Sequence, residues 1–135
     1  MYTVGKIDPE HFKNVSPILT DDVIITERQI AHIMERHPQD YERFAGYIPQ
    51  VLKQPDFILE ANKPHRAVLL KKIVKSGNNF QLIIRIKVAT DPAEYQNSVI
   101  TYMKISDSRY KNYLRNKKIL YKSENSGYTE SVKKG

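Results

Sequence analysis

The sequence predicts an α+β fold in which N-terminal helices pack on one face of a three- to four-stranded antiparallel sheet. Helix signals gather in the first 53 residues, whereas residues 57–106 contain successive runs rich in Val, Leu and Ile. Within those runs, residues 80–88 alternate between an apolar and a largely polar side, which is typical of a strand with one buried face. A turn containing Gly and Asn, residues 76–79, precedes this strand and favours an antiparallel hairpin.

The clearest single element is a helix over residues 26–37. Thr26 and Gln29 form a capping box, in which each side chain can satisfy the other residue's free backbone N–H. The apolar stripe follows the three- and four-residue spacing of one helix face and comprises Ile30, Ile33 and Met34. Pro38 disfavours the α conformation at the preceding His37 and ends the helix there. His37 is therefore expected at a helix end, on the side that faces the body of the protein.

Further helices are expected before and after this one. Pro9 at a first helical position predicts a short helix over residues 9–14. A longer helix is expected over residues 39–53, and Pro49 should kink it or split it in two. The last helix is expected over residues 107–116.

Candidate strands occupy residues 2–7, 23–25, 57–60, 66–75, 80–88, 98–106 and 119–122. The apolar side of the strand over residues 80–88 should receive the helices. By simple alternation, the opposite side of the sheet is expected to carry Arg85, Lys87, Tyr102 and Lys104. Residues 1–122 are predicted to form a single domain, and residues 123–135 a disordered basic tail with almost nothing to bury.

The net charge of +7 is unevenly distributed along the chain. Residues 1–62 hold 6 Lys or Arg against 10 Asp or Glu, a net charge of −4. Residues 63–135 hold 16 against 5, a net charge of +11. Such an asymmetry favours a basic surface that binds a polyanion such as a nucleic acid. The alternative is a set of lysine-rich strands and a basic tail that only interact with solvent.

Several classes of function are excluded by what the sequence lacks. The chain has no cysteine, which rules out disulfides and thiolate metal sites, and it has no P-loop, dinucleotide-binding glycine motif or GxSxG element. His32 and His37 lie about 140° apart around their helix, so they do not form a metal-binding pair. No apolar run is long enough to span a membrane and the N-terminus has no signal-peptide core. A cytoplasmic protein with no membrane partner is expected, unless the chain is delivered within a larger phage or toxin protein.

A basic, aromatic sheet face close to a histidine can cleave RNA without a metal or cofactor. A base removes the proton of the 2′-hydroxyl, cations stabilise the crowded phosphate and an acid protonates the leaving oxygen, which leaves a 2′,3′-cyclic phosphate. His37 is the candidate acid or base because histidine titrates near neutral pH. Arg85 and Lys104 are the candidate phosphate stabilisers.

Each candidate also has a structural interpretation. His37 can be a histidine favoured by the negative end of the helix dipole. Arg85, Lys87 and Lys104 can solvate an exposed sheet face. Tyr102 either stacks on a base or is a cross-strand packing partner. A run of cations either follows the phosphates of a nucleic acid or solvates a helix face, and it comprises Arg109, Lys111, Arg115, Lys117 and Lys118.

Four segments together resemble the phage-associated barnase/EndoU/colicin/RelE-like (BECR-fold) nuclease domains. They read ITERQIAHIMERHP; YIPQVLKQPDFILE with the following NKP; NFQLIIRI; and NSVITYMKIS with RYKNYLRNKKILYK. The resemblance implies a helical N-terminal part followed by a four-stranded antiparallel sheet. It also implies a metal-independent, cofactor-free endoribonuclease of toxin type that acts on RNA, with tRNA as one candidate substrate and an immunity or antitoxin protein as a candidate partner.

The resemblance also assigns residues to the site. Arg36, His37 and Pro38 form its RHP element, Arg85 is the basic residue of the NFQLIIRI strand, and Thr101 to Lys104 form its TxxK element. The expected catalytic residues are thus His37, Arg85 and Lys104. The expected substrate-binding residues are Arg36, Lys87, Thr101, Tyr102, Ser106, Arg109, Tyr110 and Arg115. His37 and the two cations are expected on different faces, so they can meet only at an end or edge of the sheet.

Two other functions fit the same residues. The basic face can bind RNA or DNA without cleaving it, in which case binding is sensitive to salt and no turnover occurs. Alternatively, the chain is a structural or interaction domain of a phage or mobile-element protein, and its charge serves solubility. Absence of nucleic-acid affinity at low salt would favour that third function.

Overall fold

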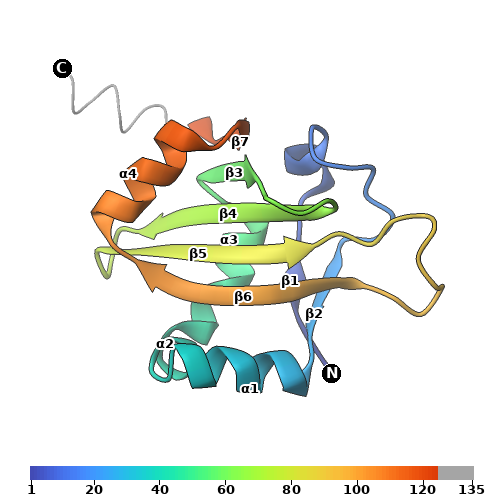
Figure 1. Ribbon diagram of the computed structural model, residues 1–135, viewed down its shortest axis with the longest axis horizontal. Helices are drawn as coiled ribbons and strands as arrows, with labels where there is room; N and C mark the ends of the chain where they lie inside the picture. The colour runs from blue at the N-terminus through green and yellow to red at the C-terminus, as the bar shows by residue number, and fades with distance from the viewer. Residues whose placement is uncertain (125–135) are drawn as a thin grey trace.

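The computed structural model describes residues 1–124, which are built around one seven-stranded sheet (Figure 1). Its strands are β1 (Tyr2–Lys6), β2 (Asp22–Ile25), β3 (Phe57–Glu60), β4 (Arg66–Ile73), β5 (Asn78–Arg85), β6 (Asn97–Ile105) and β7 (Ile119–Lys122). They lie in the order β1-β2-β6-β5-β4-β3-β7, and every neighbouring pair is antiparallel except β2 with β6. The predicted α+β class is confirmed. The predicted three- to four-stranded sheet is wrong, because the short strands from both ends of the domain extend its edges.

The helices are η1 (Pro9–Phe12), α1 (Glu27–Arg36), α2 (Asp40–Phe44), η2 (Ala45–Tyr47), α3 (Ile48–Lys53) and α4 (Asp107–Asn116). The helix expected over residues 39–53 is therefore split into three short pieces. Pro49 lies in the first turn of α3, where its missing N–H costs nothing. The tail predicted for residues 123–135 lies outside the described residues, apart from Ser123 and Glu124.

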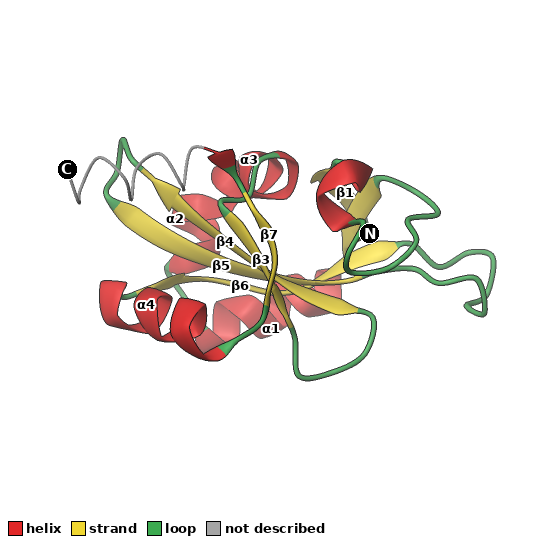
Figure 2. Ribbon diagram, turned by 90° about the horizontal axis from the view of Figure 1, so that it is seen from above, coloured by secondary structure: helices red, strands yellow, loops and turns green. Residues whose placement is uncertain are grey.

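Helices cover both faces of the sheet, so the expectation that they all pack on one face is wrong. Figure 2 shows α3 and α4 on opposite sides, and we call these sides the α3 face and the α4 face. The larger core fills the α3 face and includes Phe12, Leu52, Phe80 and Leu82. A smaller core lies between the sheet and α4, and it is made by Phe57, Leu59, Val68, Leu70 and Ile105 with Tyr110, Tyr113 and Leu114.

The outer edge of β6 is covered by helices where its neighbouring strand ends. β2 pairs with β6 only at Asn97 and Ser98, and beyond them α1 runs along the edge (Figure 1). The Gln29 side chain donates from Nε2 to the Ile100 carbonyl at 2.7 Å and to the Val99 carbonyl at 3.4 Å. These bonds satisfy backbone groups that a missing strand would otherwise have paired.

The predicted N-terminus of α1 is confirmed, although only half of its capping box forms. The Thr26 hydroxyl accepts a hydrogen bond from the Gln29 N–H at 3.1 Å. Since the Gln29 side chain is bonded to β6, it is not the return half of the box. A tertiary contact has therefore replaced a local one.

A bulge in β6 decides which side chains share a face. Ile83 pairs with Thr101 and Ile84 pairs with Val99, so Ile100 is an extra residue with no partner on β5. The alternation reverses at this point, which places Tyr102 on the α3 face. The expectation that Tyr102 and Lys104 share a face with Arg85 is therefore wrong, because it assumed an uninterrupted strand.

None of the helices within residues 1–124 combines the length and the hydrophobicity that crossing a bilayer requires.

Candidate functional site

The three residues expected to be catalytic do not form one site. Lys104 pairs with Phe80 and Ser98 pairs with Arg85, so the two cations stand at opposite ends of β5. Five residue steps along β5, roughly 17 Å, separate the two positions, and the bulge puts the two cations on opposite faces. A single phosphate cannot contact both.

His37 and Lys104 instead lie close to each other at the junction of α1, α2 and β6. His37 caps the C-terminus of α1, and its carbonyl accepts a hydrogen bond from the Asp40 N–H at 3.0 Å. The Asp40 carboxylate in turn accepts from the Lys104 N–H at 3.1 Å. Lys104 Nζ lies 6.0 Å from the centre of the Phe44 ring. We call this region, with exposed Arg36 beside it, the α1–α2 corner.

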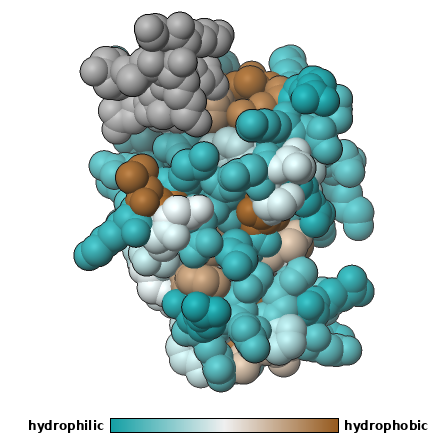
Figure 3. Space-filling view, turned by 90° about the vertical axis from the view of Figure 1, so that its left-hand side faces the viewer, coloured by the Kyte–Doolittle hydropathy of each residue, from teal (hydrophilic) through white to brown (hydrophobic). Residues whose placement is uncertain are grey.

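The end of the molecule that carries α2 is largely hydrophilic, with only scattered hydrophobic spots (Figure 3). Arg43 reaches the same Phe44 ring at 5.1 Å. The α1–α2 corner is thus a polar surface with several cations and one half-buried imidazole.

Arg85 is held by a carboxylate on the loop that follows its strand. Its guanidinium donates to both oxygens of Asp91, each at 2.9 Å. The hydrogen bond from Arg85, followed by that from the Val88 N–H, lowers the pKa of the Asp91 carboxyl to about 2. The pKa of Arg85 is raised by the same hydrogen bond. Lys87 also fastens this loop, because its Nζ donates to the Ala93 carbonyl at 2.9 Å.

Tyr102 is part of the core. It is fully buried, its ring stacks on Phe80 with centroids 5.4 Å apart, and its hydroxyl donates to the Phe44 carbonyl at 2.8 Å. Burial, reinforced by the negative charge of Asp40, raises the pKa of the hydroxyl well above its usual value. A role in stacking RNA bases is incompatible with this position, and the structural interpretation of Tyr102 as a packing residue is correct.

The other expected substrate-binding residues are spread over the α4 face and α4 itself. Thr101 lies on the α4 face beside Ile83. Ser106 caps α4 by accepting a hydrogen bond from the Arg109 N–H at 3.1 Å. Tyr110 packs edge-on against Phe57. Arg115 is exposed and reaches Asn112 at 3.4 Å.

A groove of about 300 Å³ opens on the α4 face, between the sheet, α4 and the loop that joins β3 to β4. Its apolar and aromatic walls are formed by Ala61, Val68, Ile83 and Tyr113. Its polar and basic lining consists of Asn62, Lys63, Arg66, Gln81 and Lys117. We call this concavity the α4 groove.

Side chains of α4 and of the β3–β4 loop form the part of the groove that lies opposite the sheet. Lys117 Nζ donates to Asn62 Oδ1 at 3.2 Å, which joins the end of α4 to the loop. Lys117 also lies 5.8 Å from the centre of the Tyr113 ring. Arg109 lies 5.5 Å from that ring and donates from Nε to the Tyr113 hydroxyl at 3.1 Å. Tyr113 is therefore held in place by two cations.

A second cluster of charges lies where β4 begins, next to the groove. Arg66 is directly opposite Arg85 in the β4–β5 ladder, and within residues 1–124 no carboxylate forms an ion pair with it. The preceding residue, His65, has φ of +62°, an uncommon conformation for residues other than Gly, although His adopts it more often than most side chains do. The charge of His65 is one of the causes that lower the pKa of Asp91, although the smallest of them. Arg66 is thus a cation available to a bound anion, and His65 directly precedes it in the chain.

The sequence analysis did not identify His65, Arg66, Gln81 or Tyr113 as site residues, and it considered Lys117 only as one member of a run of cations. One signal was present for Gln81, which is a lone amide between Phe80 and Leu82 in an otherwise apolar run. The contribution of Tyr113 and Lys117 depends on where α4 packs, which is not a local property of the sequence.

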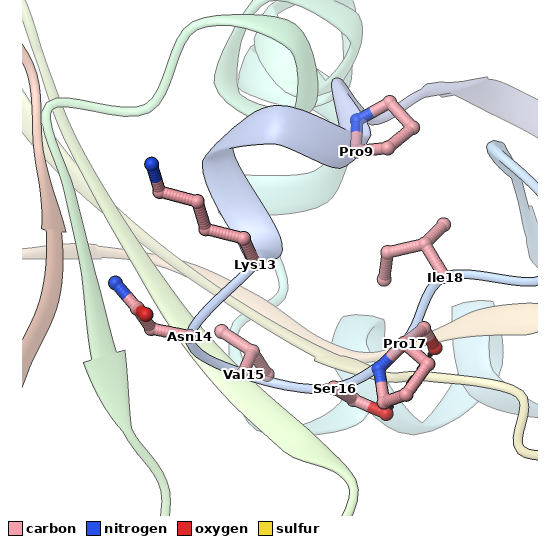
Figure 4. A pocket seen from close by; sticks show the side chains of 7 residues that line it. All are labelled: Pro9, Lys13, Asn14, Val15, Ser16, Pro17 and Ile18. Atoms are coloured by element: carbon pink, nitrogen blue, oxygen red, sulfur yellow. Dashed lines mark hydrogen bonds between the residues drawn. The ribbon is translucent and has the colours of Figure 1, made fainter.

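A larger cavity of about 530 Å³ lies elsewhere, in the segment that follows η1 (Figure 4). Its lining is Pro9, Lys13, Asn14, Val15, Ser16, Pro17 and Ile18. Lys13 is the only ionisable residue among them, so this cavity lacks the paired groups that acid–base catalysis uses. In the described part of the chain, no three His, Asp or Glu residues are grouped in a way that could hold a metal ion.

One comparison with known proteins gives a match. The family model described as phage-Barnase-EndoU-ColicinE5/D-RelE like nuclease2 matches residues 2–122, a span that includes all seven strands and the α4 groove. Neither the curated proteins nor the solved structures contain a significant match to the chain.

Proposed function

The chain belongs to the phage-Barnase-EndoU-ColicinE5/D-RelE like nuclease2 family, and on that premise we propose that it is an endoribonuclease that cleaves RNA in the α4 groove. The observation that carries this proposal is the composition of the groove. A polar floor, an aromatic wall and three basic side chains share one concavity of about 300 Å³. Aromatic and polar groups can stack on and hydrogen-bond to bases, and the cations can bind phosphates.

The proposed reaction is transesterification within the RNA chain. A base removes the 2′-hydroxyl proton, the 2′-oxygen attacks the adjacent phosphorus, and the bond to the 5′-oxygen breaks as an acid protonates that oxygen. The products are a 2′,3′-cyclic phosphate and a 5′-hydroxyl. RNA supplies its own nucleophile, so the proposed reaction does not require a metal or a cofactor.

Residues that line the α4 groove, together with His65 just before Arg66 in the chain, have suitable chemistry for each step. Arg66 offers a planar fork of donors to the phosphate, and Lys117 offers a second positive charge at the other side of the groove. His65 is the proposed acid or base, because it directly precedes Arg66 and its strained backbone is a common feature of functional sites. Arg85 then serves mainly to position the loop through Asp91.

The basic surface extends beyond the groove along α4. Exposed Arg109, Lys111 and Arg115 are proposed to contact phosphates of a longer substrate, for which tRNA is the first candidate. An acidic immunity or antitoxin protein is the proposed partner that would cover the same surface.

The α1–α2 corner is a second candidate location for the chemistry. The observation that favours it is the connection of His37 to Lys104 through Asp40. We place the reaction in the α4 groove because the bulge in β6 separates this corner from Arg85 and from the other cations of the α4 face.

The test is incubation of total RNA and purified tRNA in EDTA with wild type and with Arg66→Ala. The proposal predicts cleavage by wild type, products whose masses fit a 2′,3′-cyclic phosphate, and a loss of roughly 10²–10³-fold in rate for Arg66→Ala. Circular dichroism of both proteins is the control for folding. Salt-sensitive RNA binding without cleavage would instead support the non-catalytic binding module.

A further inference from the structure

Gln81 has an amide oxygen that no group within residues 1–124 satisfies. The side chain is only 2 % exposed, and its Oε1 has no hydrogen-bond partner within the described chain. Gln81 also lines the α4 groove. Gln81 therefore combines a buried amide oxygen without a partner with a place in the lining of a concavity that is open to a ligand.

An unpaired buried amide oxygen is costly, and most buried polar groups in native proteins are paired. An apolar side chain of the same size would avoid this cost at position 81. Ile83 is its neighbour on the same face of β5, Leu70 pairs with it on β4 and Met103 pairs with it on β6, so the surroundings are suited to an apolar residue. A ligand that donates a hydrogen bond to Oε1 would satisfy this oxygen and would explain why an amide occupies position 81.

The groove around Gln81 suits one flat, unsaturated ring. Its volume of about 300 Å³ is at the small end of ligand pockets, which are typically ~300–1,000 Å³. Apolar walls from Val68 and Ile83 can contact the faces of a ring, while Lys63 and Arg66 can reach a phosphate attached to it.

We propose that the α4 groove binds one unpaired nucleobase of the RNA, and that hydrogen bonding to the amide of Gln81 selects this base. The inference rests on the proposed function, which supplies RNA as the ligand. The four bases carry N–H donors and acceptors at different positions along their Watson–Crick edges, so the donor and acceptor of the Gln81 amide pair better with one base than with the others. This edge is free only when the base is unpaired, so cleavage is directed to single-stranded loops.

The first experiment measures binding without relying on cleavage. The four nucleoside 3′-monophosphates are titrated into wild type and into Gln81→Met, and backbone amide shifts are followed by NMR. Met has similar volume but cannot pair with a base. Gln50→Met is the matched control, because Gln50 is exposed on α3 at the other side of the sheet.

The proposal predicts that wild type binds one nucleotide more tightly than the other three, and that the amide shift changes are largest in β4, β5 and α4. Gln81→Met should lower the affinity for this nucleotide by roughly tenfold to a hundredfold. Gln81→Met should also have a higher Tm than wild type without ligand, because the unpaired oxygen is gone. Equal affinities for the four nucleotides in wild type would overturn the proposal, and so would an unchanged preference in Gln81→Met.

A second experiment sequences the ends of RNA fragments produced by wild type, Gln81→Met and Gln81→Glu. The expected result is a preferred base for wild type, a flattened preference for Gln81→Met, and a shift towards guanine for Gln81→Glu. A carboxylate accepts from both the N1–H and N2–H of guanine. Base-selective binding without any cleavage would support the role of Gln81 and refute the endoribonuclease. Cleavage with the same base preference in all three proteins would refute the role of Gln81 and keep the endoribonuclease.

Discussion

Removing the hydroxyl of Tyr102 should destabilise the protein while leaving its cleavage of RNA intact. Tyr102→Phe keeps the ring that stacks on Phe80 at 5.4 Å and deletes only the donor to the Phe44 carbonyl at 2.8 Å. Loss of one buried hydrogen bond costs about 1–2 kcal/mol. For a domain of this size, each kcal/mol lowers Tm by about 3–6 °C, so the expected fall is about 3–12 °C.

The assay combines thermal unfolding with RNA cleavage measured well below the Tm of the variant. Tyr102→Ala removes the ring as well and should cost about 3–5 kcal/mol, which gives a graded series from the same position. Cleavage per folded molecule should remain within twofold of wild type for Tyr102→Phe. A tenfold loss of cleavage without a change in Tm would show that the hydroxyl contacts RNA, and would refute the placement of Tyr102 in the core.

Three further predictions follow from individual contacts. Asp91 has a pKa of about 2, below its ordinary value of 3.8, so its carboxylate stabilises the fold above about pH 4, and this contribution is lost as pH falls from about 4 to 2. Asp91→Asn should therefore be less stable than wild type at neutral pH and should show a flatter fall in stability with acid, which urea unfolding at several pH values can check. Gln29→Ala should lower the free energy of unfolding by about 1 kcal/mol and speed amide exchange in the second half of β6, since the Ile100 carbonyl loses its donor; unchanged exchange would contradict the covered edge. Lys63→Ala should reduce the dependence of log K for single-stranded RNA on log salt by about 0.7, as expected for one lost phosphate contact, and an unchanged slope would exclude Lys63 from the interface.

The elements that depend on local signals could be predicted from the sequence. The helix over residues 107–116 and the strand over residues 57–60 match α4 and β3, because caps, turns and alternation act within a few residues. The cap at Thr26 is local in the same sense. The strands near both ends of the domain were also found, but their assembly into one sheet depends on contacts between distant segments.

The candidate site could not be predicted in the same way. Ile100, the bulged residue of β6, looks like any other strand residue, yet it moves Tyr102 and Lys104 to the opposite face. The α4 groove combines Arg66 on β4, Gln81 on β5 and Lys117 after α4, and only the packing of α4 on the sheet brings these side chains together. Residue types indicated RNA chemistry, but strand register and helix packing decide where that chemistry can occur.

The central claim is that RNA is cleaved in the α4 groove rather than at the α1–α2 corner. Single-turnover cleavage rates of a tRNA in EDTA for wild type, Arg66→Ala and Lys104→Ala test it most directly. Cleavage in the α4 groove predicts a loss of roughly 10²–10³-fold for Arg66→Ala and a change of less than threefold for Lys104→Ala. The reverse pattern, with Lys104→Ala inactive and Arg66→Ala close to wild type, would contradict cleavage in the α4 groove and place the reaction beside His37.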